Sequence, residues 1–448
     1  MAVTDVTQSV FGFMTEGPFE ENVNRLRTVN RAFDSAVRQT RRDLKIDTTT
    51  GPYELRSCWP KVNDLFISGL ADDETAPFVF PDPEIFATLF PSLTKVTSYF
   101  SAVDVTTFLT AVSGLPRLAS FDMECDWGDE FPDQFRITTK AQVLALTRLV
   151  QNAPLEHLSM TGHALIAPNT TPFMRALAVN TSIVHLDLTR SSCSFEDLAH
   201  VLRTNRSIVH IVFNNPHDDE DAVKPVAAVL AYNENTTLKS LSLLGSNIPI
   251  ITNALRTNTT LESITMGPFD ESYDFNELTH DHLDAINDML AVNSTLVSLT
   301  LDGNSIAHIV LEDNDGDDEN DEPVVDMTAL LTNTTLRSFT LQGFLDSGYR
   351  AKLVLDVCNK IGQNQTGVTS LHLDCLADEL VDLSGNTTLT SLTLEIQSGF
   401  VISELGPIFA SMTSLSELDL RQCYGITPAQ REELAQQLPT CAIRFQAT

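Results

Sequence analysis

Hydrophobic and polar positions alternate in short runs along most of this chain, and a similar short polar segment precedes these runs. The pattern Asn-x-Ser/Thr-φ-x-x-φ-x-φ, where φ is hydrophobic, begins at Asn180, Asn205, Asn235, Asn258, Asn293, Asn333 and Asn386. Strict alternation over a few residues predicts a short strand with one buried side. Between these strands, residues 195–205, 223–233 and 283–293 carry apolar side chains three and four positions apart. That spacing predicts amphipathic helices that pack one face against the strands.

The strand and helix units repeat at intervals that define the expected architecture. The hydrophobic cores begin at Leu118, Leu155, Ile183, Ile208, Leu238, Leu261, Leu296, Leu336, Val368, Leu389 and Leu415, with a weaker one at Leu93. Most of these cores lie 21 to 32 residues apart. A period of about 20–30 residues with an L-x-x-L-x-L core is typical of a leucine-rich repeat. We therefore expect an α/β fold, a right-handed horseshoe solenoid with a concave parallel sheet and outer helices. We expect the asparagine after each helix to be a left-handed or capping residue.

Three acidic inserts interrupt the series of repeats, some of them where two hydrophobic cores lie far apart along the chain. They lie near 217–222, 268–284 and 311–323, and the last carries eight carboxylates. Each follows a predicted strand, so we expect all three along one edge of the solenoid. An EF-hand calcium loop needs Gly at its sixth position and Glu at its twelfth. Counted from Asp313, these positions hold Asp318 and Val324. A solvated acidic loop is therefore favoured over a calcium site.

The two ends of the chain depart from the repeat. Residues 21–46 show helical periodicity, and seven of the 28 Lys and Arg residues lie between Arg25 and Lys45. We expect residues 1–90 to form a small helical module, either F-box-like or a cap on the solenoid, with the solenoid spanning 91–448. Residues 424–448 contain an amphipathic helix and a short Ile-x-Phe strand, which predicts a C-terminal cap.

The fuller repeat pattern extends back into the preceding helix. It stands from Leu255 through Asn258 to Met266, and again from Leu290 through Asn293. In this arrangement residues 91–448 resemble the leucine-rich repeats of the ribonuclease-inhibitor and NOD-like-receptor class. The asparagine that usually follows the strand in that class is present at Asn304 and replaced elsewhere by Ser191, Pro216, Phe269, Phe344 and Gln397. We therefore expect an incomplete asparagine ladder in the loops after the strands.

The N-terminal segment resembles a degenerate F-box that lacks the usual Leu-Pro opening. A Leu-x-x-Val-x-Arg-x-Phe element is formed by Leu26, Val29, Arg31 and Phe33. The resemblance implies docking to a ubiquitin-ligase adaptor subunit. It places Val10, Phe11, Phe13, Leu26, Val29 and Phe33 at adaptor-facing or core positions. The final repeat, with Cys423, Gly425, Ile426 and Thr427, resembles the cysteine-containing repeats that follow F-boxes.

Charge and cysteine content narrow the classes of partner and compartment. A formal net charge of −32 argues against nucleic acid and anionic membrane, and favours protein partners with a basic surface or simple solubility. Seven scattered cysteines without C-x-x-C spacing favour a reducing, intracellular location. With no signal peptide or transmembrane span recognised, we expect a cytoplasmic protein, and Asn-x-Ser/Thr sequons that are structural. Nucleotide-binding, hydrolase and metalloprotease motifs are absent from the sequence, so we expect no enzyme activity, no cofactor and no metal site.

Candidate binding residues follow from the strand alternation, because the polar positions face the concave side. One column of aligned positions reads His157, His185 and His210, then serine from Ser240 to Ser391. The histidines are either solvated strand residues or a site for a transition metal or pH sensing. The Ser/Thr middle lacks the Trp, Tyr and Arg anchors of typical interfaces. We therefore predict partner contacts at the two ends and on the acidic edge: Tyr99, Phe100, Asp122, Glu124, Trp127, His157, His185, His210, Asp315, Asp317, Asp318, Asp419, Arg421 and Tyr424.

These patterns together favour a protein–protein interaction scaffold or adaptor. One alternative is an F-box-type substrate receptor of a ubiquitin ligase. A second is a regulator of a small GTPase resembling RanGAP-type activators, which are also acidic repeat solenoids. Recovery of an adaptor subunit would favour the first alternative, and stimulated GTP hydrolysis the second.

Overall fold

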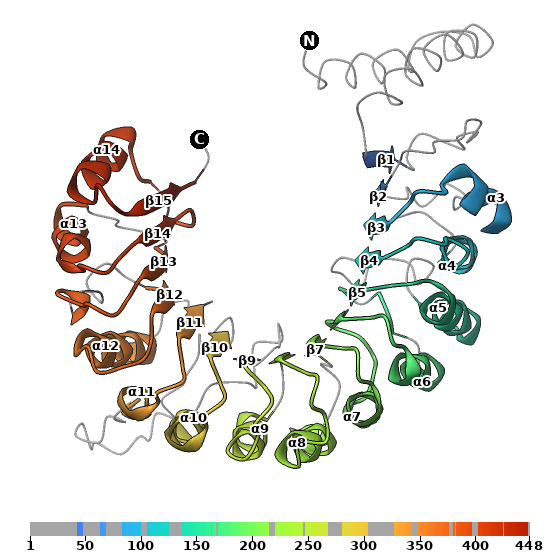
Figure 1. Ribbon diagram of the computed structural model, residues 1–448, viewed down its shortest axis with the longest axis horizontal. Coiled ribbons are helices and arrows are strands. Elements are labelled where there is room, and N and C mark those ends of the chain that lie inside the picture. Colours follow the sequence, from blue (N-terminus) through green and yellow to red (C-terminus); the bar gives the residue numbers. More distant parts are fainter. Residues whose placement is uncertain are drawn as a thin grey trace, which may run out of the picture.

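The computed structural model shows a curved solenoid built on one continuous parallel sheet (Figure 1). It describes residues 43–47, 63–68, 83–99, 105–124, 137–162, 164–166, 169–214, 220–244, 247–267, 280–302, 327–342, 348–375, 380, 382–396, 402–423 and 425–446. Within these ranges fifteen strands lie side by side in sequence order, and every neighbouring pair is parallel. The strands line the inner side of the horseshoe and the helices its outer side. This confirms the leucine-rich repeat solenoid expected from the sequence.

Strands of four or five residues form the sheet. Their bounds are β1 Asp43–Asp47, β2 Asp64–Ser68, β3 Lys95–Tyr99, β4 Ser120–Glu124, β5 His157–Thr161, β6 His185–Leu188, β7 His210–Asn214, β8 Ser240–Leu244, β9 Ser263–Gly267, β10 Ser298–Asp302, β11 Ser338–Gln342, β12 Ser370–Asp374, β13 Ser391–Glu395, β14 Glu417–Leu420 and β15 Ala442–Phe445.

The outer layer consists of helices that alternate with most of the strands. Their bounds are α3 Pro83–Leu89, α4 Val105–Val112, α5 Lys140–Asn152, α6 Thr171–Val179, α7 Phe195–Thr204, α8 Lys224–Ala231, α9 Ile248–Leu255, α10 His280–Val292, α11 Ala329–Thr332, α12 Gly348–Gly362, α13 Ile402–Ser411 and α14 Pro428–Gln437. A short 3-10 turn, η3, spans Glu220–Val223. The three helices predicted at 195–205, 223–233 and 283–293 are found as α7, α8 and α10.

The core lies between the sheet and the helices and runs the length of the solenoid. Each strand buries the residues between its concave positions, as in β10, where Leu299 and Leu301 are fully buried. Helix α7 contributes Leu198 and Leu202 from one face, and Ser194 caps its start by accepting a hydrogen bond from the Asp197 amide at 3.1 Å. Because each repeat contacts mainly its neighbours, stability is distributed along the array.

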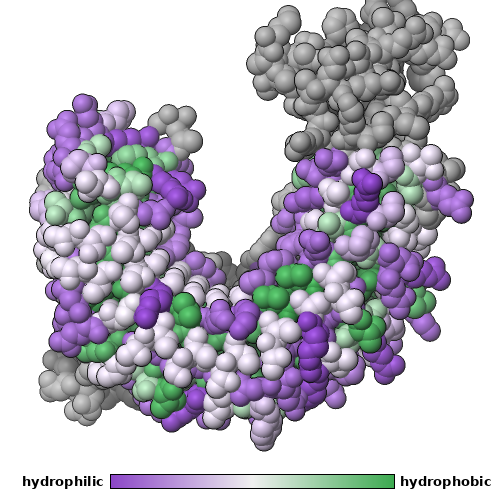
Figure 2. Space-filling model, viewed as in Figure 1, coloured by the Kyte–Doolittle hydropathy of each residue, from purple (hydrophilic) through white to green (hydrophobic). Residues whose placement is uncertain are grey.

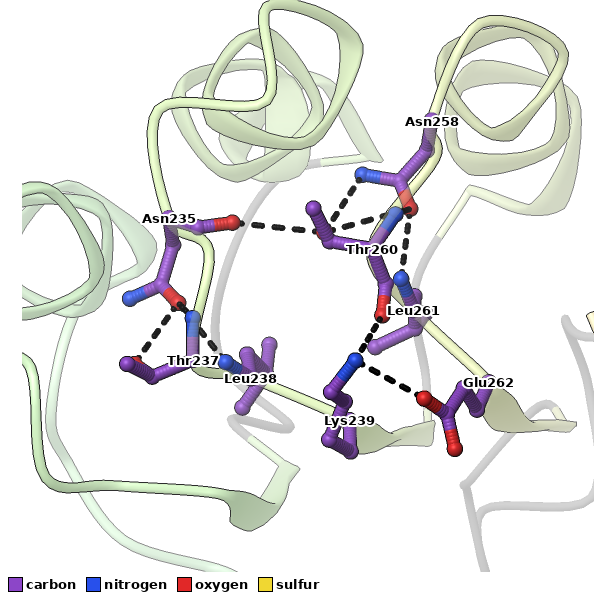
Figure 3. A network of polar contacts seen from close by, with 8 residues as sticks. All are labelled: Asn235, Thr237, Leu238, Lys239, Asn258, Thr260, Leu261 and Glu262. Atoms are coloured by element: carbon purple, nitrogen blue, oxygen red, sulfur yellow. Dashed lines mark hydrogen bonds and ion pairs between the residues drawn. The ribbon is translucent and has the colours of Figure 1, made fainter. Parts of the chain in front are cut away.

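A ladder of asparagines, buried except at Asn180, joins successive repeats at the turn between helix and strand. Asn258 accepts hydrogen bonds from the amides of Thr260 and Leu261 at 3.1 and 2.8 Å, and donates to the Leu230 carbonyl of the preceding repeat at 2.8 Å. Figure 3 shows this turn beside the equivalent one at Asn235. The same arrangement recurs at Asn180, Asn205, Asn293, Asn333 and Asn386. The asparagine side chains therefore close each turn and tie it to its neighbour.

The asparagines after the helices were predicted to be left-handed or capping residues, and both forms are found. Asn205 and Asn333 are the C-cap residues of α7 and α11, with extended backbones at φ of −70° and −71°. Asn233, which follows α8, is left-handed with φ of 52°, and Asn364 is left-handed with φ of 56°. The predicted incomplete ladder concerned the loops after the strands, most of which lie outside the described residues.

The parallel sheet begins well before the boundary expected at residue 91. Strands β1 and β2 pair with each other, and β2 pairs with β3. The helix predicted over residues 21–46 is wrong at its end, because Asp43–Asp47 is a strand. Residues 1–42 lie outside the described residues. At the other end, α14 and β15 occupy the expected cap region, and β15 pairs with β14. Among the described helices, none has the length and apolar content to cross a membrane.

Candidate partner-binding surface on the concave sheet

Strand register arranges the concave side chains in two columns. The first column runs from Lys95 through Ser120, His157, His185, His210, Ser240, Ser263, Ser298, Ser338, Ser370 and Ser391 to Glu417. The second runs from Thr97 through Asp122, Ser159, Asp187, Val212, Ser242, Thr265, Thr300, Thr340, His372 and Thr393 to Asp419. Successive residues of each predicted column therefore lie on neighbouring strands, which are about 4.8 Å apart.

Asp122 is the centre of a charged cluster near the N-terminal end of these columns. Its Oδ2 lies 3.2 Å from Lys95 Nζ and accepts a hydrogen bond from the Thr97 hydroxyl at 3.3 Å. Its Oδ1 lies 3.3 Å from His157 Nε2, a contact that is an ion pair only when the His157 ring is protonated and that lacks the alignment of a hydrogen bond. One carboxylate thus connects side chains from β3, β4 and β5.

Three imidazole rings continue this cluster along the first column. His185 and His210 are stacked, with ring centroids 4.4 Å apart and planes 3° from parallel. His157 lies on the other side of His185, with centroids 5.8 Å apart and a tilt of 40°. Burial and the neighbouring His210 and His157 lower the pKa of His185 below its usual value, so its ring is neutral at pH 7.

Asp187 lies between Ser159 and Val212 in the second column and is partly buried. Its Oδ1 accepts hydrogen bonds from the Thr189 amide at 3.0 Å and the Thr189 hydroxyl at 2.7 Å. Burial raises the pKa of its carboxyl, and the two Thr189 hydrogen bonds oppose that rise. The side chain is therefore held in one orientation in an environment that disfavours its charge.

The middle of the concave surface carries small hydroxyl side chains. From β8 to β13 the first column is serine throughout, and the second is serine or threonine except at His372. These hydroxyl side chains suit contacts based on hydrogen bonds better than a broad apolar interface. Figure 2 views the horseshoe down its shortest axis, so the concave surface is seen edge-on; on the face in view, hydrophilic and intermediate residues predominate and hydrophobic ones form small scattered groups.

A second charged cluster occupies the C-terminal end. Arg421 donates to both carboxylate oxygens of Asp419, at 3.0 and 2.6 Å, and these hydrogen bonds hold the pKa of Asp419 below its ordinary value. Arg444 Nη2 lies 2.6 Å from Glu417 Oε1. His372 Nε2 lies 3.0 Å from Glu395 Oε1 across β12 and β13. Neither Lys95 nor Arg444 was among the predicted binding residues, although each occupies a concave position set by the strand alternation.

The structure brings together some of the predicted binding residues and leaves others undescribed. Asp122, His157, His185 and His210 form one continuous N-terminal group, and Asp419 contacts Arg421. Glu124 is exposed at the end of β4, and Tyr99 is described by its backbone at the end of β3. Phe100, Trp127, Asp315, Asp317, Asp318 and Tyr424 lie outside the described residues. Among described side chains, no group of three or more His, Cys, Asp and Glu has the arrangement of a metal site.

Comparison with known proteins gives a structural similarity and no match in sequence. No family model matches the chain, and no curated protein matches it in sequence. Among solved structures, the chain is similar to the crystal structure of the Rad7 and Elc1 complex in yeast, with 14% sequence identity and a TM-score of 0.39. The similarity covers 92% of this chain and 85% of that chain. The parallel sheet, the outer helices and the repeat motif of the present protein define it as a leucine-rich repeat solenoid.

Proposed function

We propose that this protein is a non-catalytic interaction scaffold that binds a protein partner across its concave sheet. The observation that carries the proposal is the distribution of charge on that surface. Charged clusters centred on Asp122 and Asp419 lie at its two ends, and uncharged serine and threonine side chains separate them. From β4 to β14 the surface spans about 48 Å along the sheet at the usual strand spacing. An elongated partner contacting both ends fits this arrangement.

The chemistry of the surface favours binding over catalysis. In the described part of the two columns, each titratable side chain either pairs with a neighbouring residue or lies among hydroxyl groups. Solenoids of this kind use their extended concave surface to hold other macromolecules. With a net charge of −32, the partner surface we propose is basic.

The concave location is tested by placing bulky charge on each side of the solenoid. Tagged full-length protein would be compared with the Thr300→Arg/Ser338→Arg variant, whose substitutions lie on adjacent concave strands. The control is Val292→Arg/Leu355→Arg, at side chains 51% and 40% exposed on outer helices. Partners recovered from source-cell lysate are identified by mass spectrometry. We expect the concave variant alone to lose its partner, and equal recovery by both variants would contradict the proposal.

A finer form of the proposal is a substrate receptor of a ubiquitin ligase. It rests on the F-box resemblance of Leu26, Val29, Arg31 and Phe33. Removal of residues 1–42 tests it while retaining β1, whereas removal of residues 1–90 would take β1 and β2 from the sheet and α3 from the outer layer. Loss of an adaptor subunit with the shorter deletion, with other partners retained, is the expected result.

The GTPase-regulator alternative rests on architecture alone, and GTP hydrolysis assayed with the recovered partners tests it.

A further inference from the structure

Three histidines occupy the same concave column on three neighbouring strands. The parallel register of β5, β6 and β7 aligns His157, His185 and His210. Their ring centroids lie 5.8 and 4.4 Å apart, and the planes of the second pair are 3° from parallel. Imidazole is the side chain whose ordinary pKa places its change of charge between about pH 5 and 8. This histidine column can therefore gain several positive charges on one narrow strip of the surface that we propose binds the partner.

Acidic groups near the start of the histidine column balance a charge on His157. Asp122 Oδ1 lies 3.3 Å from His157 Nε2, and this contact becomes an ion pair when the ring is protonated. The charges that act on the carboxyl of Asp187, beside the column on β6, are His157 and Asp122. Glu156, the residue before His157, is exposed, and Lys95 pairs with Asp122 at 3.2 Å. A proton on His157 is thus compensated by carboxylates already in place.

Protons on the next two rings meet no such compensation. Burial lowers the pKa of His185, and the neighbouring His210 and His157 lower it further. Within the described part of the chain, neither His185 nor His210 forms a hydrogen bond or ion pair with a carboxylate. On the far side of His210, β8 adds a serine to the column, and Lys239 just before β8 is paired with Glu262. Charge gained by the stacked rings therefore stays on the surface as net positive charge.

Acidification consequently changes the charge that a partner meets over β6 and β7. Near neutral pH the rings are an uncharged strip beside Asp187, which suits a basic partner. As the pH falls through the range in which imidazoles titrate, the rings become positive, and like charges facing each other across an interface oppose binding. His372 in the second column differs, because it lies 3.0 Å from Glu395 and its protonation forms an ion pair. Proton uptake by the histidine column and partner binding therefore oppose each other.

We propose that His157, His185 and His210 act together as a pH-operated switch that releases the basic protein partner when the surroundings become acidic. This inference rests on the proposed scaffold function and adds a regulatory property to the same surface. Protons on the stacked rings repel the partner, while the contact with Asp122 holds the first ring of the column in place. The switch requires no movement of the backbone, because it changes the charge of side chains that already line the sheet.

The first test of the switch needs no partner. Nuclear magnetic resonance of full-length protein with isotope-labelled histidine follows the titration of each ring, and single histidine-to-serine variants assign the signals. In His157→Ser/His210→Ser the titration midpoint of His185 should rise, because a repelling charge on each side has been removed. Serine stands at this position in β8 and β9, so the sheet should accept it. An unchanged His185 midpoint would show that the rings titrate independently and would overturn the switch.

The second test follows the protein partner that wild type retains and Thr300→Arg/Ser338→Arg loses. Tagged wild type and the triple-serine variant His157→Ser/His185→Ser/His210→Ser are loaded with source-cell lysate at about pH 7.5, after their urea midpoints near neutral pH are shown to agree. Washing to about pH 5.5 spans the range of imidazole titration. Wild type should lose about tenfold of the retained partner, a usual size for the coupling of two binding events, and the triple-serine variant should keep it.

A matched variant separates the histidine column from general effects of acid. His200→Ser removes an exposed imidazole from the outer helix α7 and should release the partner as wild type does. Retention by wild type at the lower pH, or equal release by the triple-serine variant, would overturn the switch and leave the scaffold function standing. If Thr300→Arg/Ser338→Arg retains every partner that wild type binds, the scaffold function itself is wrong.

Discussion

The asparagine ladder gives the sharpest prediction about stability. Asn293, 5% exposed, accepts hydrogen bonds from the amides of Thr295 and Leu296 at 3.0 and 2.8 Å. It donates to the carbonyls of Leu255 and Asn258 at 2.6 and 3.3 Å. In Asn293→Ala both carbonyls keep another donor, whereas the two amides lose their acceptor. Two unsatisfied amides at about 1–3 kcal/mol each predict a loss of roughly 2–6 kcal/mol in the free energy of unfolding.

Urea denaturation followed by far-ultraviolet circular dichroism measures this loss. The midpoint multiplied by the slope gives the free energy of unfolding, provided that the variant retains the wild-type slope. Asn152→Ala is the control, because Asn152 is exposed at the end of α5 and should change the free energy by less than about 0.5 kcal/mol. A loss below about 1 kcal/mol for Asn293→Ala would refute the assignment of the ladder as the junction between repeats.

Three further predictions concern steric fit, pH and thiol reactivity. Gly267→Ala should lower the free energy of unfolding by about 1–3 kcal/mol in urea titrations, because a Cβ would lie 2.5 Å from the Asp302 carbonyl oxygen; an unchanged midpoint would contradict this packing. The pKa of His185 is lowered from 6.5, so the unfolded chain binds the proton more readily and stability should fall as pH drops through this value. His185→Ser should reduce that fall in urea midpoints measured across pH, and an unchanged slope would show that another group is responsible. Burial raises the pKa of Cys193 and Cys423 to about 12, so peptide mapping should find both unmodified by iodoacetamide at mildly alkaline pH in the native protein and modified in urea.

The repeat and its strand register follow from the sequence because they depend on local periodicity. The alternation at Leu296, Leu299 and Leu301 determines which side chains are buried, and stacking of similar repeats aligns equivalent positions. The alignment of His157, His185 and His210 was predictable for this reason. The start of the sheet was not, because β1 and β2 lack the asparagine lead-in and the DLKID segment follows a basic helical pattern.

Pairing within the binding surface depends on side-chain reach, which periodicity does not encode. The sequence places Asp122 and Asp187 in the same column, yet only Asp122 has a lysine, Lys95, on the neighbouring strand to pair with it. The sequence left open which conformation each repeat asparagine adopts, because an asparagine after a helix suits both a left-handed residue and an extended cap. The choice between them depends on carbonyls in the preceding repeat, such as that of Leu230 for Asn258.

The most direct test of the central claim is partner capture with the two double-arginine variants. Full-length protein, Thr300→Arg/Ser338→Arg and Val292→Arg/Leu355→Arg would be compared at equal amounts after their urea midpoints are shown to agree. The account predicts that a protein partner is recovered with the wild type and with the outer-helix variant, and lost with the concave variant. Equal recovery with all three would contradict binding across the concave sheet.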